Sequence, residues 1–311
     1  MRKIILHIPH SSTGIPDSQG FIVDADFLNS EILKLTDWYT DELFYSQNDI
    51  MLIAGFSRIF CDVERFENDA KEKMSQFGMG VLYQKSDDGK EIRLISPELR
   101  HKILTDFYRK HHSGFTQAVQ NQLCENGEAL IIDCHSFPDI PLKRDLNQDA
   151  NRPDFNVGTD PFHTPEILFE VAVRFFEEKG FSVGVDWPYS GSIVPLKFYQ
   201  NDKRVKSIML EINRKLYLNG ATNKKSEGFV KIRKVVGEFI ESVRNTFLSL
   251  TKSGSVYLNP SYTFTTFCVS SFKLNFSSTA FRPSMLICNN FSESDKTSAH
   301  FSARALAVLG V

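Results

Sequence analysis

The sequence predicts an α/β fold, in which a mixed and mostly parallel sheet is flanked by helices. Two observations favour this class. Short apolar runs alternate along the chain with longer segments of helical periodicity, and polar residues follow directly after several of the runs. Strands that alternate with helices imply crossover connections and helices on both faces of the sheet. A chain of 311 residues can bury a sizeable core in such a fold.

The expected strands are short apolar runs, several of them bounded by turn-forming or polar residues. They cover residues 3–8, 50–53 with 57–61, 79–84, 129–134, 181–186 and 207–212. In sheets of this kind ligands collect beyond the carboxyl ends of the strands. A functional site is therefore expected among the residues that directly follow these runs.

The expected helices have apolar residues at helical spacing and recognisable ends. Ser96 is a candidate cap with Pro97 at the first helical position, and Gly180 is a typical helix stop. The segments are 25–45, 96–123, 164–180 and 227–250. Residues 1–250 are thus expected to form one α/β domain.

The composition changes after residue 250. Residues 251–311 are rich in Ser, Thr and Phe and show no clear period. Three interpretations remain open: a poorly ordered tail of uncertain structure, an accessory β-rich piece, or a stretch not selected for folding. The sequence assigns no chemistry to this segment.

Charge and composition exclude several classes of function. The formal net charge of -2 gives no electrostatic reason to expect a nucleic acid or an acidic membrane as partner. There is no signal peptide pattern and no apolar run of membrane-spanning length. The five cysteines form no spaced framework, which favours the cytoplasm. The sequence does not predict the oligomeric state.

Polar residues cluster where the expected strands end. His10 follows the first strand, residues 62–66 follow the run at 57–61, and His135 follows the strand at 129–134. Such groups cost several kcal/mol when buried without partners, so they must satisfy one another or something held between them. The sequence therefore predicts a site at this edge of the sheet.

Two histidines and an acid at one edge suit a divalent metal, with zinc the usual choice. His10 and His135 are the best candidate ligands. The third ligand stays open, with Asp37 preferred over the other acids, which are Asp62, Glu64 and Asp133. Asp133 lies two residues before His135 and shares its side of the strand, so it is an alternative partner that orients the imidazole.

The remaining histidines near the site have simpler interpretations. His7 is expected to be a satisfied strand histidine rather than a ligand of the same metal. His111 and His112 are neighbours on an expected helix and point about 100° apart, so they cannot chelate together.

Glu211 ends an apolar strand, where an acid is poorly suited to a core. Beside a metal, such a carboxylate can take a proton from water and pass it to a leaving nitrogen. The alternative is that Glu211 pairs with Arg65 or Arg214. Both arginines present a planar fork that matches a carboxylate, so they are candidate contacts for an acidic substrate.

The loop "WPYSGS" at 187–192 completes the candidate site. Tyr189, Ser190 and Gly191 are expected to contact the substrate, because a flexible loop with backbone N–H groups can close over a ligand.

Read in order, six motifs resemble the N-formylglutamate amidohydrolase family, also called N-formylglutamate deformylase. The motifs are "IPHSSTGIP", "DWYTDELF", "CDVERF", "IIDCHSFP", "PYSGS" and "LEINRKLYL". The similarity as a whole runs from about residue 4 to residue 245. The resemblance implies a phosphorylase/hydrolase-like fold related to the zinc carboxypeptidases. It also implies metal-dependent hydrolysis of N-formyl-L-glutamate to formate and L-glutamate in histidine degradation.

Carried over by position, the family's metal motifs match His10 and His135, its general base matches Glu211, and its substrate-binding arginine matches Arg65. The carboxypeptidase pattern has a glutamate three residues after the first histidine, whereas this chain has Thr13 there. The acidic ligand must therefore come from elsewhere in the chain. Two functions stay open: a zinc amidohydrolase acting on a small acidic N-acyl amino acid, and a non-catalytic sensor that binds an acidic metabolite.

Overall fold

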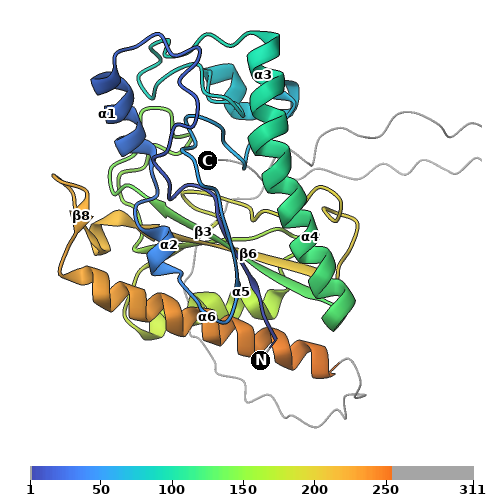
Figure 1. Ribbon diagram of the computed structural model, residues 1–311. Helices are drawn as coiled ribbons and strands as arrows, with labels where there is room; N and C mark the ends of the chain where they lie inside the picture. Colours follow the sequence, from blue (N-terminus) through green and yellow to red (C-terminus); the bar gives the residue numbers. More distant parts are fainter. Residues whose placement is uncertain (1, 254–311) are drawn as a thin grey trace, which may run out of the picture.

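The computed structural model describes residues 2–253 and confirms the predicted α/β class (Figure 1). Its main sheet has six strands in the order β2 (Ile50–Ile53), β1 (Ile5–Ile8), β3 (Ala129–Phe137), β6 (Val205–Asn213), β4 (Phe155–Gly158) and β5 (Val183–Val185). The first four strands are mutually parallel. β4 runs antiparallel to β6 and pairs in parallel with β5, so the sheet is mixed. A two-stranded hairpin follows, β7 (Leu218–Asn219) and β8 (Lys224–Lys225).

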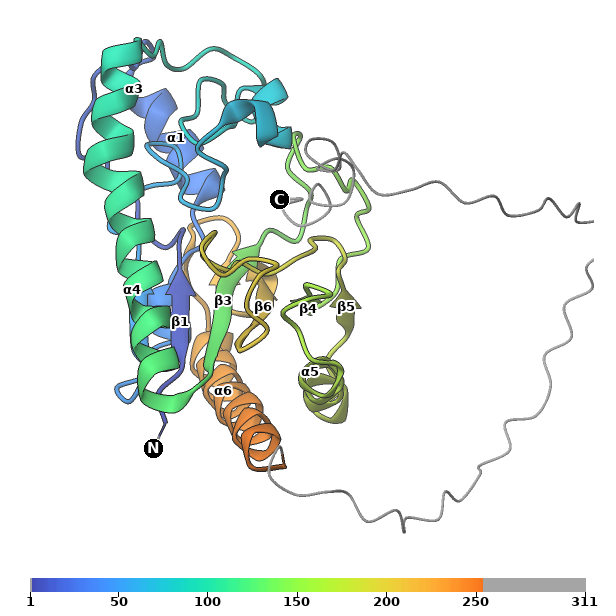
Figure 2. The ribbon, with the colours of Figure 1, turned by 90° about the vertical axis from the view of Figure 1, so that its right-hand side faces the viewer.

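Helices cover both faces of the sheet. Figure 2 shows α4 (Arg109–Asn126) on one side, and α5 (Glu166–Glu178) and α6 (Gly228–Ser253) on the other. Side chains alternate along β3: Leu130, Ile132 and Cys134 pack in the core with α5 and α6, whereas Ala129 and Ile131 pack with α4. Asp133 and His135 consequently project from the α4 face.

Two of the strand predictions are wrong. Residues 57–61 form successive turns, in which Phe60 and Cys61 both donate to the carbonyl of Ser57. Residues 79–84 contain only an isolated bridge between Met79 and Tyr83. Both apolar runs are buried, but in the cores of a lobe of loops and short helices beyond the carboxyl ends of β1 and β3 (Figure 2). Burial explains their composition without a place in the sheet.

The helix expected over 25–45 is interrupted. The structure has α1 (Ala25–Leu35) and α2 (Thr40–Leu43), separated by an extended Thr36 and by Tyr39 in a left-handed conformation. The backbone N–H of Asp37 in this break donates to the carbonyl of His10 at 3.0 Å. The interruption thereby fixes the strand-end loop of β1 against the segment that carries Asp37.

The other helices follow the prediction closely. The segment expected at 96–123 begins at Pro97 with Ser96 as its cap, and contains α3 (Pro97–Ile103), a short π-helical turn η3 (Leu104–Tyr108) and α4. α5 and α6 fill the segments expected at 164–180 and 227–250. Among residues 2–253, no helix is both long enough and apolar enough to cross a bilayer. The segment 251–311 lies outside the described residues, apart from the end of α6.

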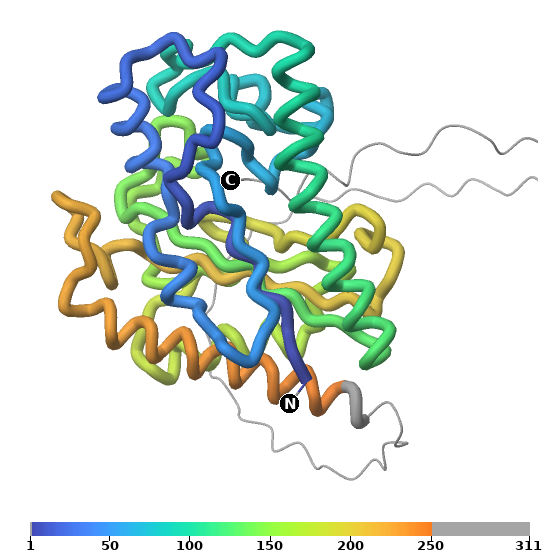
Figure 3. The backbone as a smooth tube through the Cα atoms, in the orientation of Figure 1, coloured from blue at the N-terminus to red at the C-terminus, as the bar shows by residue number. Residues whose placement is uncertain are grey.

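Arg244 on α6 joins the last helix to the start of the chain, and Figure 3 shows the two segments meeting. Its guanidinium donates to Asp49 at 2.7 and 2.5 Å and to the carbonyl of Arg2 at 3.0 Å. Asp49 also accepts from the backbone N–H of Ile4. Because Arg244→Met would leave a buried carboxylate without its cation, we expect a loss of about 3–5 kcal/mol in the free energy of unfolding, measured by urea titration.

The matched control is Lys234→Met on the same helix. Lys234 is 79% exposed and lies 4.0 Å from Glu238, so its removal should change stability by less than about 0.5 kcal/mol. Burial tends to raise the pKa of Asp49, but hydrogen bonds from Arg244 and Ser46 outweigh it and hold the pKa below its usual range. The Arg244–Asp49 pair therefore stabilises the protein above about pH 3.9. Below that pH the difference in the free energy of unfolding between wild type and Arg244→Met should shrink as Asp49 is protonated. An equal loss in the free energy of unfolding for Lys234→Met and Arg244→Met would contradict this account.

Candidate active site

Four polar side chains share the α4 face of the sheet near the carboxyl ends of its parallel strands. The strand register pairs His7 on β1 with Asp133 on β3, and His135 on β3 with Glu211 on β6. Because residues paired across parallel strands point to the same face, the sheet itself brings these groups together. The predicted clustering of His135 and Glu211 at one edge is thus a consequence of register.

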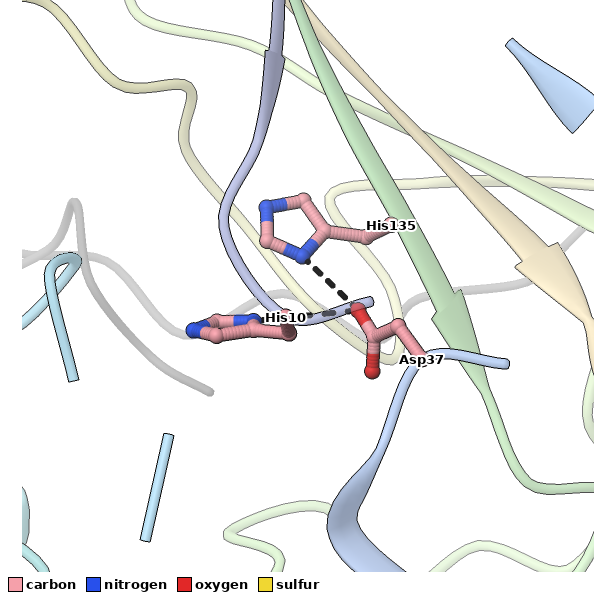
Figure 4. A group of neighbouring side chains, drawn as sticks. All are labelled: His10, Asp37 and His135. Atoms are coloured by element: carbon pink, nitrogen blue, oxygen red, sulfur yellow. Dashed lines mark hydrogen bonds and ion pairs between the residues drawn. The ribbon is translucent and has the colours of Figure 1, made fainter. Parts of the chain in front are cut away.

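His10, Asp37 and His135 converge at this edge (Figure 4). Asp37 Oδ2 lies 3.1 Å from His135 Nδ1 and 3.7 Å from His10 Nδ1. The two imidazole centroids are 5.2 Å apart, and none of the three residues is more than 2% exposed. Positions 10 and 135, distant in sequence, are therefore close enough to share an ion.

The donor set fits a metal such as zinc, since two imidazole nitrogens and a carboxylate oxygen lie within 4.8 Å of one another. His10 Nε2 lies 2.9 Å from Asp62 Oδ1, which suits an N–H donor and leaves the lone pair on Nδ1. His10 Nδ1 is buried and has no hydrogen-bond partner within residues 2–253. An orphaned nitrogen that faces an acid in this way is the arrangement a metal ligand requires.

His135 is held from both sides of its ring. Its Nδ1 faces Asp37, and its Nε2 lies 3.2 Å from both Glu64 Oε1 and Asp133 Oδ1. Burial opposes a positive charge here, but the carboxylates of Glu64 and Asp133 raise the pKa of His135 well above its ordinary value. Burial would likewise raise the pKa of Asp37, yet the nearby imidazoles of His10 and His135 and the guanidinium of Arg214 hold it below its usual range. The pocket is strongly anionic and favours a cation.

Glu211 is buried beside this cluster, and its Oε2 has no hydrogen-bond partner within the described chain. Burial, reinforced by the carboxylates of Asp37 and Glu64, raises the pKa of Glu211 to about 8, although His135 opposes the shift. A carboxylate with a raised pKa and a free oxygen can accept and return a proton near neutral pH. The alternative prediction is that Glu211 pairs with Arg65 or Arg214. Within residues 2–253 the ion pairs of these arginines go instead to Asp62, Glu72 and Asp37.

Arg214 makes four hydrogen bonds to the protein. It donates to Asp37 Oδ1 at 3.0 Å, to the carbonyl and hydroxyl of Ser136 at 3.1 and 3.3 Å, and to the carbonyl of Lys34 at 3.0 Å. Arg65 lies at longer range from its acids, 3.5 Å from Asp62 and 3.8 Å from Glu72. Arg214 is thus positioned to fix Asp37.

A pocket opens beside these groups. Its walls include six of the nine predicted site residues, namely Asp37, Arg65, His135, Tyr189, Glu211 and Arg214. The hydroxyl of Tyr189 accepts from Arg152 at 2.8 Å and donates to Asp145 at 3.1 Å. The N–H of Gly191 donates to Asp186 at 3.2 Å, and neither Ser190 nor Gly191 lines the pocket. Their contact with a substrate stays a prediction.

Arg58 and Arg144 also line the pocket, and sequence reasoning missed both. Arg58 donates to Asp62 Oδ2 at 3.0 and 3.2 Å, next to the Asp62 oxygen that holds His10. A signal existed for Arg58, which lies four residues before Asp62 in a run otherwise interpreted as a strand. Arg144 lies far from any strand end, and the sequence carries no comparable signal for it.

The fold and the site together define an α/β protein with a buried, polar pocket at the carboxyl edge of its parallel strands. Residues 2–218 match the family model FGase, N-formylglutamate amidohydrolase. The chain therefore belongs to the N-formylglutamate amidohydrolase family, a family of hydrolases, as the motifs predicted.

Two solved structures share the fold. The crystal structure of N-formylglutamate amidohydrolase from Ralstonia eutropha JMP134 superposes with a TM-score of 0.68 at 23% identity, covering 81% of this chain and 94% of the other. A gene product from Agrobacterium tumefaciens superposes with a TM-score of 0.56 at 16% identity, covering 80% of this chain and 91% of the other. A comparison with curated proteins gives no match.

Proposed function

We propose that this protein is a metal-dependent amidohydrolase that cleaves N-formyl-L-glutamate to formate and L-glutamate. The observation that carries the proposal is the placement of Glu211, buried and with an unpaired oxygen, across the strand register from His135 in the His10, Asp37 and His135 cluster. Family membership supports the reaction type and the substrate. The resemblance also links the reaction to histidine degradation, and the cytoplasm remains the predicted location.

His10, Asp37 and His135 would hold the metal, for which we propose zinc. When bound, zinc supplies Lewis-acid chemistry, which polarises the scissile carbonyl. Glu211 takes a proton from the attacking water as the oxygen adds to the formyl carbon. It then returns the proton to the glutamate nitrogen as the carbon–nitrogen bond breaks, releasing formate and the free amine.

Arg214 supports this chemistry indirectly. Its hydrogen bond to Asp37 Oδ1 leaves Oδ2 directed at the two imidazoles. The sequence suggested that Arg214 contacts the substrate, but its guanidinium is already bonded to Asp37, Ser136 and Lys34. We therefore assign it to positioning Asp37. We assign the recognition of the acidic substrate to Arg65, because Arg65 lines the pocket and matches the family's substrate-binding arginine.

Arg65→Met tests the choice of substrate. If Arg65 binds the side-chain carboxylate, a charge-assisted contact of about 1.5–3 kcal/mol is lost, and the KM for N-formyl-L-glutamate should rise about 10- to 100-fold. The preference for N-formyl-L-glutamate over N-formyl-L-glutamine should fall by the same factor. Steady-state release of free amine measures both values.

Lys197→Met is a control, since the exposed Lys197 bonds to Gln120 on α4 and lies outside the pocket that includes Asp37, Arg65, His135 and Glu211. An unchanged preference in Arg65→Met would assign substrate recognition to another residue.

The sensor alternative predicts binding of an acidic metabolite without turnover. A screen of N-formyl and N-acetyl amino acids for release of free amine separates the two functions directly. Glu211 Oε2, which has no hydrogen-bond partner within residues 2–253, favours the enzyme, because a purely binding pocket gains nothing from a buried carboxylate oxygen that is left unpaired. Tight binding of N-formyl-L-glutamate with no release of amine from any compound would establish the sensor instead.

A further inference from the structure

A second group of buried ligand atoms lies on the other side of the His135 ring, and the proposed mechanism does not use it. His7 Nδ1 and the carboxylate oxygens of Glu64 and Asp133 all lie within 4.8 Å of one another. Their residues are 0%, 6% and 2% exposed. The group is as enclosed as the His10, Asp37 and His135 cluster.

The charge balance differs between the carboxylates around the site. Asp62 is paired with Arg58, and Asp37 with Arg214, both at 3.0 Å. Within residues 2–253, Glu64 and Asp133 make ion pairs only with the imidazoles of His7 and His135. Neither carboxylate is paired with an arginine or lysine of the described chain. Once His135 is a neutral ligand of the first metal, this group therefore carries excess negative charge where water cannot screen it.

The His7 ring is fixed with one nitrogen facing the carboxylates. It stacks on Phe115 with centroids 4.8 Å apart, and its Nε2 lies 3.0 Å from His111 Nε2. Its Nδ1 lies 2.9 Å from Asp133 Oδ1 and 3.6 Å from Glu64 Oε1. When Nε2–H donates to His111, the lone pair of Nδ1 faces the two carboxylates, as it does in a histidine that binds a metal.

We infer that His7, Glu64 and Asp133 form a second cation site, distinct from His10, Asp37 and His135. One imidazole and two carboxylates suit a divalent transition-metal ion such as zinc, whereas calcium and magnesium prefer oxygen ligands alone. Such an ion neutralises both carboxylates. Each carboxylate oxygen has two lone pairs, so it can accept the N–H of His135 and still bind the ion.

This site is independent of the proposed hydrolysis. The ring of His135 lies between the two groups, with Nδ1 toward Asp37 and Nε2 toward Glu64 and Asp133. The second ion therefore lies behind the proposed catalytic metal. Its presence is tested by counting ions, without any assay of activity.

The experiment is elemental analysis of the full chain after loading with zinc and removal of excess ion by gel filtration. We expect about two equivalents in the wild type and about one in His7→Ala, because the polar contacts of His7 go to Asp133, Glu64 and His111 and not to the first cluster. His10→Ala should also hold about one equivalent, and the double variant none. Should His7→Ala fail to fold by circular dichroism, Glu64→Gln replaces it as a variant of the same shape.

His101→Gln is the control, because His101 is exposed on α3 and offers no ligand to either group. It should keep two equivalents. If the wild type held only one equivalent of zinc and His7→Ala held the same amount, the second site would be overturned. A wild type that holds two ions but releases no amine would leave the second site standing and refute the proposed hydrolysis, so the two proposals fail separately.

Discussion

His135→Ala is expected to lose both bound metal and turnover. His135 faces Asp37 with one nitrogen and Glu64 and Asp133 with the other, so its removal breaks the first cluster and disturbs the second. Losing the ion removes several kcal/mol of transition-state stabilisation, which corresponds to a fall of about 10³-fold or more in kcat/KM. Elemental analysis and the release of free amine from N-formyl-L-glutamate measure the two losses.

His163→Ala provides the matched control for this variant. His163 is also a fully buried histidine, but it lies 2.8 Å from the carbonyl of Val205 and accepts from the N–H of Gln200, away from both ligand groups. It should lose stability through the unpaired backbone groups while its folded fraction keeps metal and turnover. Turnover retained in His135→Ala would remove the proposed site.

Glu211→Gln is expected to reduce kcat by about 10²- to 10⁴-fold, the usual contribution of a positioned proton acceptor. Glutamine has nearly the same shape as glutamate but cannot take a proton from water. Because Glu211 belongs to neither ligand group, metal content should stay at the wild-type value. Substrate affinity, measured by calorimetry with N-formyl-L-glutamate, should also stay close to that of the wild type.

Glu238→Gln is the control for the Glu211 variant. Glu238 pairs with Lys179 on the surface, so this change should leave kcat, affinity and metal content alone. If Glu211→Gln turned over substrate at the wild-type rate, the proton acceptor would have to be another group. If the wild type bound the compound without turnover, the sensor would be the correct function.

The sequence predicted the central strands because each is a short, almost wholly apolar run. The same signal failed at 57–61, since burial in the lobe beyond the sheet demands the same composition as a strand. No sequence pattern predicted β4, where only four residues, including an asparagine and a glycine, pair with β6. That strand depends on its neighbour in space, which a local pattern does not reveal.

The site was partly predictable for a similar reason. His10 and His135 were predicted to share a site because ligands collect at strand ends, and the structure brings them close to Asp37, the preferred third candidate. His7 was interpreted as a satisfied strand histidine, and it does contact Asp133. Its place in a second group depends on the chain bringing Glu64 from the loop after 57–61 to the same point. No spacing within a single segment encodes that approach.

The most direct test of the account is an anomalous difference map at the zinc absorption edge from a crystal of the zinc-loaded protein. We predict a peak bonded at about 2.0–2.2 Å to one atom each of His10, Asp37 and His135. An anomalous map with no peak between these three side chains, from crystals grown with excess zinc, would contradict the central claim that they hold a common metal beside Glu211.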